Sequence, residues 1–264
     1  MTKLLIRELI NKIEYDFPIN SSMSYDNSGA NIICFDNEIS GILVCLDVTL
    51  DAVNYAKENN INLIISHHPI IFNEIRNIND DPVSKRIKLL NKFDISAYSC
   101  HTNYDVNIDN GMGGNLIKLL FSDKEIFSHE FLDSFDIENK QYAIGDIITL
   151  KDKIEFNDIV SLIKNKLELE DNKISYYNFN QIVKKIVIIP GSGSGDIDLV
   201  IKSKPDLLIT SDLKHNNIID LREENISFIN ATHYGLEKIF IESFYNYLIN
   251  KFNCFKILKY YINL

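Results

Sequence analysis

Two short apolar segments separated by a helical segment place the strongest constraint on the fold of this chain. Residues 41–47 (GILVCLD) and 62–66 (NLIIS) are rich in Ile, Leu and Val and are bounded by polar or turn-forming residues, as buried strands are. Residues 49–59 between them have the length of a crossover helix. Parallel strands need such a crossover, which is usually helical. The sequence therefore predicts a βαβ unit and an α/β fold with a largely parallel sheet.

The same alternation of apolar and helical segments continues along the chain. An amphipathic helix is predicted over residues 4–17, and Pro18 ends it. Further strands are predicted at 95–100, 144–150, 186–189 and 206–210, and further helices at 83–91, from about 114, at 157–167 and at 196–202. Residues 122–142 are irregular and acidic, so we expect them to connect two halves. The predicted domains are an N-terminal α/β half, residues 1–124, and a C-terminal α/β half, residues 125–264.

Composition excludes several classes of protein. The 264 residues are 45% hydrophobic and 24% charged, and no apolar run approaches the roughly 20 residues that a membrane-spanning helix needs. The first residues lack the pattern of a secretory signal, so we expect a soluble, cytoplasmic protein without a membrane partner. A net charge of −10 disfavours a nucleic-acid polymer as partner. The four cysteines have no CxxC spacing, and we expect reduced, buried thiols.

Histidines follow two of the predicted strands at the point where each strand ends. His67 and His68 come directly after the strand 62–66, and His101 follows the strand 95–100, with Asp105 four residues later. Open parallel sheets bind ligands at the carboxyl ends of their strands. We therefore expect these side chains to meet at one edge of the sheet.

A third element adds an imidazole and a carboxylate. His233 and Glu237 share one face if a helix begins just after Ala231, because residues four apart are neighbours on a helix. Neutral imidazole and carboxylate are ligands that zinc, manganese, iron and related ions accept, and a carboxylate can bridge two ions. Strand-end histidines also serve as hydrogen-bonded spacers, but the coincidence of all three elements favours a metal site.

Other polar positions have open alternatives. His101 is either a third metal-ligating imidazole or a base that relays protons beside the metal, and we keep it as the catalytic candidate. His215 follows the strand 206–210 and is expected to face the same cleft, whereas His129 is expected on the surface. Residues 191–195 (GSGSG) could cradle an anion before a helix or form a tight turn, and they lack the ending of a P-loop.

Several short motifs in a fixed order carry a family resemblance. They are YDNSG at 25–29, CLDVT at 45–49, SHHP at 66–69, HTNYD at 101–105, TSDLKH at 210–215 and HYGLE at 233–237. Through them the chain resembles, almost end to end, the GTP cyclohydrolase 1 type 2 homologues, also called NIF-three-like dinuclear-metal proteins. The resemblance implies two intertwined α/β/α halves with mostly parallel sheets and a homohexameric ring built as a trimer of dimers. It also implies a set of metal ligands: His67, His68, Asp105, His233 and Glu237.

The resemblance and the residues together lead to two hypotheses of function. The first is a dinuclear metal-dependent hydrolase resembling GTP cyclohydrolase 1 type 2, with two divalent ions such as Zn, Mn or Fe and a purine nucleotide as small-molecule substrate. The alternative is a metal-binding scaffold or regulatory protein without catalysis. Asn73 stands where the family often has Lys, and Gly145-Asp146 replaces a common Gly-Arg pair. Two cationic groups that could hold a phosphate are therefore absent at these positions.

Overall fold

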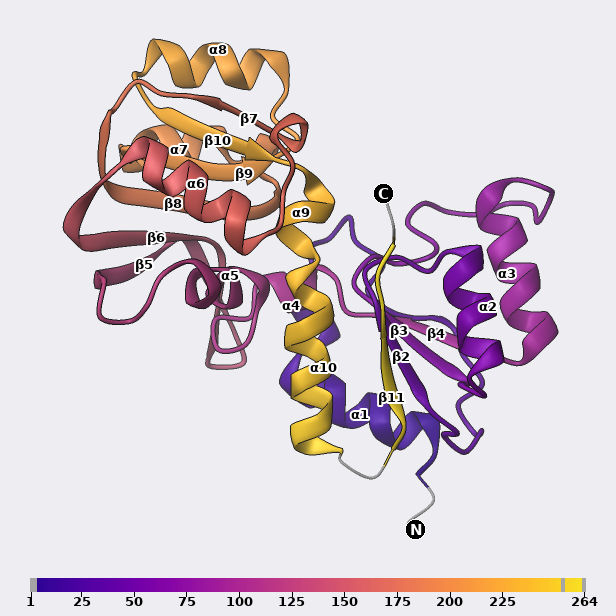
Figure 1. Ribbon diagram of the computed structural model, residues 1–264. Helices are drawn as coiled ribbons and strands as arrows, with labels where there is room; N and C mark the ends of the chain where they lie inside the picture. The colour runs from indigo at the N-terminus through magenta and orange to yellow at the C-terminus, as the bar shows by residue number, and fades with distance from the viewer. Residues whose placement is uncertain (1–3, 253–254, 263–264) are drawn as a thin grey trace. The chain divides into compact units, whose positions relative to one another are not determined.

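The chain folds into two units, each built on its own sheet. The computed structural model describes residues 4–252 and 255–262, and its contacts divide the chain into a first unit, Met1–Tyr104 with Phe240–Leu264, and a second unit, Asp105–Ile239 (Figure 1). These ranges differ from the expected division at residues 124 and 125. The difference arises because the last helix and strand of the chain pack with the N-terminal sheet rather than with the segment that precedes them.

The sheet of the first unit is mostly parallel, as the apolar runs predict. Its strands lie in the order β1-β4-β3-β2-β11. Strands β2, β3, β4 and β11 pair in parallel, and only β1 is antiparallel, against β4. Their bounds are β1 Gly29–Ile32, β2 Ile42–Cys45, β3 Leu63–Ser66, β4 Ser96–Ser99 and β11 Ile257–Tyr260.

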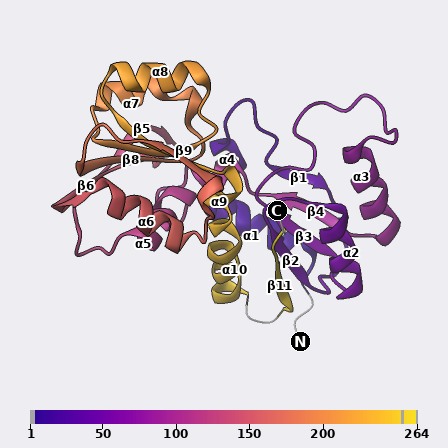
Figure 2. The ribbon, with the colours of Figure 1, turned by 45° about the horizontal axis from the view of Figure 1, so that its top comes forward.

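Helices cover both faces of this sheet. They are α1 Ile6–Asp16, α2 Leu50–Glu58, α3 Pro82–Phe93 and α10 Ile239–Lys251, with the short helices η1 Ile19–Ser21 and α4 Thr102–Asp105. Figures 1 and 2 show α2 and α3 on one face of the sheet and α1 and α10 on the other. Side chains alternate along each strand, so Leu43 and Cys45 of β2 join the core under α2 and α3, while Tyr98 of β4 reaches α1 through a hydrogen bond to Glu14.

The sheet of the second unit is mixed. Its strands lie in the order β5-β6-β8-β9-β10-β7, in which β8, β9 and β10 pair in parallel and the outer pairs are antiparallel. The bounds are β5 Ile126–Ile137, β6 Lys140–Glu155, β7 Ile174–Tyr177, β8 Ile182–Ser192, β9 Leu207–Ser211 and β10 Ser227–Ala231. The predicted α/β class is confirmed, and the parallel pairing of this second sheet is confined to its centre.

The expected connection at 122–142 is instead a long hairpin, so that interpretation was wrong. Strand β5 and the start of β6 pair along their length, and the turn uses Glu138 and Asn139, both with positive φ, at 49° and 65°. Two such residues match the twist of the flanking strands. The sequence of this segment has an acidic and irregular pattern because most of β5 is exposed or only partly buried. Charged residues therefore interrupt the alternation of apolar residues expected for a strand.

Helices again cover both faces of the second sheet. They are α5 Met112–Leu120, α6 Phe156–Lys166, α7 Ile197–Ser203, α8 His215–Glu223 and α9 His233–Glu237, with the short turns η2 Asp171–Lys173 and η3 Gly193–Gly195. The helices α5 and α6 pack on one face and α7 and α8 on the other (Figure 2). The strands β8 and β9 are therefore buried on both sides, which explains why they read as continuous apolar runs.

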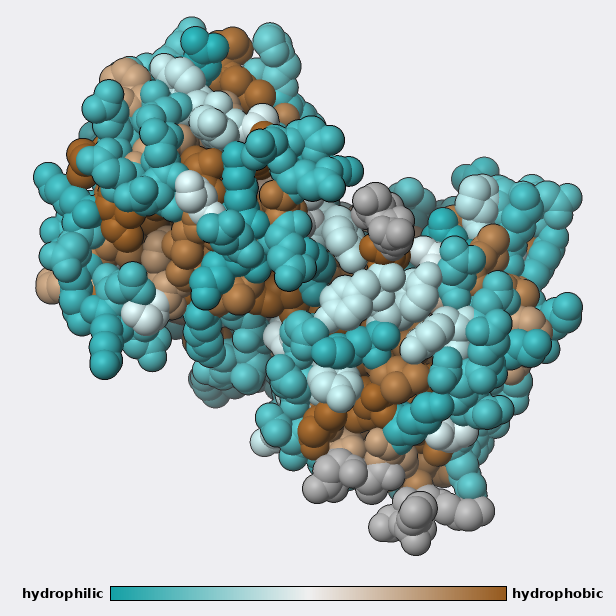
Figure 3. Space-filling view, viewed as in Figure 1, coloured by the Kyte–Doolittle hydropathy of each residue, from teal (hydrophilic) through white to brown (hydrophobic). Residues whose placement is uncertain are grey.

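The surface agrees with the composition, and the thiols do so in part. Hydrophilic residues cover most of the face seen in Figure 3, with smaller apolar patches between them. Among the described residues, no helix is both long and apolar enough to cross a membrane. Cys45 and Cys100 are buried, as expected, whereas Cys34 is exposed; Cys254 lies outside the described residues. Burial raises the pKa of the Cys45 thiol well above its usual range.

The N-cap of α2 provides a test of this fold. The Thr49 hydroxyl accepts a hydrogen bond from the Ala52 N–H at 3.0 Å. Replacing Thr49 with Ala leaves that donor without its cap, so we expect a loss of about 1 kcal/mol in the free energy of unfolding, measured by urea denaturation. Thr49→Ser keeps the hydroxyl and is the matched control. Equal stability of the two variants would contradict the cap.

Candidate metal centre

Three histidines meet at the carboxyl edge of the first sheet. Strands β2, β3 and β4 run in register, with Cys45, Ser66 and Ser99 as their last residues side by side. The chain then continues into His67 and His68 after β3 and into His101 after β4. The ring centroids are 5.0 Å apart for His67–His68 and for His67–His101, and 5.5 Å apart for His68–His101. We call these three side chains the imidazole cluster.

Each ring of the imidazole cluster is held at Nδ1 by an oxygen. Nδ1 of His67 lies 2.9 Å from the Cys100 carbonyl oxygen, and Nδ1 of His68 lies 2.8 Å from Asp47 Oδ1. Nδ1 of His101 lies 2.6 Å from Asp26 Oδ1. A carbonyl or carboxylate oxygen only accepts, so in each ring Nδ1 carries a hydrogen, and Nε2 is the nitrogen left to face a metal ion. That is the arrangement found in metal-binding histidines.

The ligand nitrogens of the imidazole cluster are also close enough to share an ion. One ring nitrogen from each of the three residues lies within 4.8 Å of the others. His67 is fully buried, and its ring packs against Phe240 at 5.0 Å and Tyr104 at 6.2 Å between centroids. The Tyr104 hydroxyl in turn bonds Ser243 Oγ at 2.7 Å. These contacts fix the ring orientation, so the residues present fit a divalent metal ion.

Asp26 accepts five hydrogen bonds. Its Oδ1 accepts from His101 Nδ1 and from the Asn27 N–H, and its Oδ2 accepts from Ser28 Oγ at 2.6 Å and from both the N–H and the hydroxyl of Thr102. Burial alone would raise the pKa of Asp26, but the hydrogen bonds from His101, Ser28 and Thr102 hold that pKa well below its usual range. Asp26 therefore stays charged at neutral pH and fixes the orientation of His101.

His233 and Glu237 come together on α9 of the second unit. The helix begins where predicted, because the Thr232 hydroxyl caps it by accepting from the Gly235 N–H at 3.1 Å. Nε2 of His233 lies 2.8 Å from Glu237 Oε2, and Nδ1 lies 2.6 Å from Asp212 Oδ2. His233 thus shares the Nδ1 arrangement of the imidazole cluster. Glu237 is 4% exposed, which is unusual for a carboxylate unless it is paired or binds a cation.

The glycine-rich segment 191–195 is a turn that makes room for this carboxylate. Gly191 has φ of +68°, and a Cβ at this position would lie 2.2 Å from Glu237 Oε1. The Thr210 hydroxyl accepts from the Gly193 N–H at 3.0 Å, and Ser211 Oγ donates to the Gly191 carbonyl. Because the Gly193 N–H already donates to Thr210, it is not available to an anion. The geometry therefore favours the tight turn over an anion cradle.

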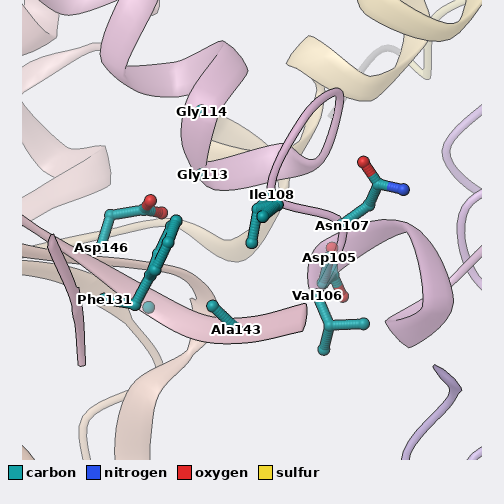
Figure 4. A pocket seen from close by; sticks show the side chains of 10 residues that line it. Asp105, Val106, Asn107, Ile108, Gly113, Gly114, Phe131, Ala143 and Asp146 are labelled. Atoms are coloured by element: carbon teal, nitrogen blue, oxygen red, sulfur yellow. The ribbon is translucent and has the colours of Figure 1, made fainter. Parts of the chain in front are cut away.

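Asp105 is the last residue of α4 and belongs to the second unit. It lines a small cavity of about 10 Å³, which is room for about one water molecule. Figure 4 shows Asp105 and Asp146 at opposite ends of the labelled group, with Ile108 between them. Asp146 is paired with His129, whose Nε2 lies 2.6 Å from its Oδ1. The acid that replaces the family's usual arginine therefore serves a local ion pair.

The structure thus gathers the expected residues in two places. His67, His68 and His101 meet in the first unit, and His233 meets Glu237 in the second. His215 starts α8 as an exposed residue, and no hydrogen bond, ion pair or ring contact joins it to any described site residue.

Sequence reasoning missed the three aspartates that hold the histidines. Asp47 and Asp212 each follow a strand within two residues of its carboxyl end. Asp26 lies just before β1, which is antiparallel to β4 and so begins at the same edge. The signal in the sequence was an aspartate next to a strand end at the same edge of the sheet as the histidines.

A substitution at Gly191 tests whether the close approach of Glu237 to the backbone is needed for metal binding. In Gly191→Ala the new Cβ collides with the carboxylate, so we expect a folded protein with a midpoint of thermal unfolding lower by a few degrees and with fewer divalent ions retained after dialysis. Elemental analysis of the dialysed protein measures the ions. Gly195→Ala is the matched control, because a Cβ there meets nothing within 4 Å. Wild-type metal content in Gly191→Ala would show that the close approach is not required.

Comparisons with known proteins agree with the motifs. A protein of Clostridium perfringens named GTP cyclohydrolase 1 type 2 homolog is 30% identical over 233 residues, covering 88% of this chain and 86% of that protein. A protein of Helicobacter pylori named GTP cyclohydrolase 1 type 2 is 30% identical over 252 residues, covering 93% of this chain and 94% of that protein.

A solved structure and a family profile extend the agreement to the whole chain. The crystal structure of a Staphylococcus aureus hypothetical protein matches with a TM-score of 0.88 and 25% identity, covering 99% of this chain and 97% of that one. The profile of the family described as Duf34/NIF3 (NGG1p interacting factor 3) matches residues 4–262. The resemblance drawn from the motifs is confirmed, and the chain belongs to the Duf34/NIF3 family.

Proposed function

We propose that the protein is a metal-dependent hydrolase that uses two divalent ions held by His67, His68, Asp105, His233 and Glu237. The observation that carries the proposal is the shared state of the histidines. In all three imidazole ligands an oxygen acceptor occupies Nδ1, so Nε2 is the nitrogen available to a metal ion. In His233 this nitrogen lies beside Glu237 Oε2, where an ion would replace the shared proton. The donor set of imidazole and carboxylate suits zinc, manganese or iron.

His101 is the proposed proton carrier. Divalent ions in such a site activate water and polarise the bond to be cleaved. Nε2 of His101 accepts the proton of the attacking water, and Asp26, bonded to Nδ1, stabilises the charged imidazolium that results. The hydrogen bonds of Asp26 to Thr102 and Ser28 keep this pair in place during proton transfer.

The proposed substrate is a purine nucleotide, opened at its imidazole ring as in a GTP cyclohydrolase reaction. The names of the Clostridium and Helicobacter relatives support this substrate class. A screen of nucleotides and phosphoesters with protein whose metal content has been measured tests it directly.

A metal-binding scaffold is the alternative, and the position of His101 gives it a specific basis. His101 has the same Nδ1 arrangement as the proposed ligands, and its ligand nitrogen lies within 4.8 Å of those of His67 and His68. If His101 binds the metal, it fills a coordination position that a hydrolase would keep for water or substrate. The ions would then serve structure or regulation.

The replacement of His101 separates the two functions. As a proton carrier, His101→Ala should lower turnover by roughly 10² to 10⁴ with metal content unchanged. Glu237→Gln is the comparison that should lose metal as well as activity, because an amide does not supply the negative charge. Metal loss in His101→Ala would identify this residue as a ligand and favour the scaffold.

We also propose that the protein assembles as a homohexamer, a trimer of dimers. Closed symmetric assembly is the ordinary outcome for soluble homo-oligomers, and the number six follows from the family resemblance. Light scattering coupled to gel filtration should give six times the chain mass of 30.5 kDa. A monomer at micromolar concentration would contradict the assembly.

A further inference from the structure

A large hollow opens in the first unit directly beside the imidazole cluster. It has a volume of about 620 Å³ and is lined by the loop that follows His68 and by the start of α3. Pro69, the residue after His68, is the first residue of the lining. The loop is anchored at this end, because Asn27 Nδ2 donates to the Ile71 carbonyl at 2.6 Å.

Two arginines line this hollow, and neither side chain is paired with a residue that the structure describes. The chain has only four arginines. Arg7 pairs with Asp36, and Arg222 stacks on the ring of Tyr177 at 4.8 Å. By contrast, the side chains of Arg76 and Arg86 make no hydrogen bond, ion pair or ring contact with any described residue.

The two acids of the same lining do not pair with these arginines. Asp81 is used as the N-cap of α3, with its oxygens accepting from the N–H and the hydroxyl of Ser84 at 3.0 and 2.6 Å. Glu74 is exposed and makes no ion pair with a described residue. The lining therefore carries two acids and two arginines, but no carboxylate of a described residue engages either guanidinium group, so both are available to bind an anion.

An aromatic ring lies between this hollow and the imidazole cluster. Phe72 lines the hollow, is 46% exposed, and lies edge-on to His101 with 6.1 Å between ring centroids. An exposed aromatic face offers contact to a planar ring, and guanidinium groups match phosphoryl oxygens in a bidentate geometry. Phe72 therefore belongs both to the hollow and to the surroundings of the imidazole cluster.

We propose that the hollow is a phosphate-binding subsite in which Arg76 and Arg86 bind the phosphoryl group of a nucleotide while Phe72 packs against its ring system. This proposal rests on the proposed function, since it assigns the substrate's anionic end to the first unit. Position 73, where the family often has Lys, is Asn in this chain and provides no positive charge. Arg76 and Arg86 supply positive charge from other positions of the same lining.

The test compares GMP with guanosine by isothermal titration calorimetry, on the full chain with measured metal content and again after metal removal. We expect GMP to bind roughly 10-fold to 100-fold more tightly than guanosine, the range of a charge-assisted hydrogen bond. Arg76→Gln and Arg86→Gln should each weaken GMP binding about tenfold and leave guanosine unchanged. Arg86→Lys keeps the charge and should retain part of the binding.

Lys85→Gln is the matched control, because it removes one positive charge from an exposed residue of α3 outside the lining. Phe72→Leu should weaken GMP and guanosine alike. Equal affinity for GMP and guanosine would overturn the subsite, as would a Lys85→Gln loss equal to that of the arginine variants. Circular dichroism confirms that each variant is folded.

The outcomes separate this subsite from the metal centre. If the wild-type protein binds two ions but does not prefer GMP, the subsite fails and the metal proposal stands. Arginine-dependent GMP binding in a protein that retains no ions would support the subsite and contradict the proposed hydrolase.

Discussion

An imidazole has two nitrogens, and a hydrogen bond at one of them decides what the other can bind. In this protein an oxygen acceptor holds Nδ1 of His67, His68, His101 and His233 in every case. The same bond sets the tautomer, the ring orientation and the basicity of Nε2. The acceptors differ, being one backbone carbonyl and three carboxylates, so the shared chemistry does not come from one repeated motif. In each of the four cases the acceptor lies beside a different element from the one that carries the histidine.

The register of the parallel strands makes this arrangement possible. The last residues of β2, β3 and β4 are direct neighbours, so the residues that follow them emerge at one edge. A slip of one residue would turn every side chain of a strand to the opposite face, and the close-packed side chains on both buried faces would then no longer fit. Apolar packing that has no chemical role therefore determines the distance between His68 and Asp47. The packing of the core sets the spacing of the strand ends, and this spacing sets the distances between the polar side chains that follow them.

The sequence predicts those parts whose signal is local. The strands β2 and β3 are short, mainly apolar runs buried on both faces, and α2 and α3 carry their own start signals in Thr49 and Asp81. The hairpin β5–β6 was missed because β5 is partly exposed and mixes charged with apolar residues. The placement of α10 and β11 could not be read, because their partners are distant in sequence. In the site, the histidines could be predicted from the sequence. The Cys100 carbonyl, which accepts from His67, could not, because a backbone group has no signature in the sequence.

The second unit is an insertion within the first, and this has a consequence for how the chain acquires its structure. Tyr247 of α10 donates to Asp16, 231 positions earlier, and β11 completes the sheet beside β2. Contacts of such long range carry a large entropic cost of loop closure and form late. The ribosome releases the whole second unit before it releases α10 and β11. The inserted unit can therefore fold first and shorten the effective loop, which brings the two separated parts of the first unit close enough to join.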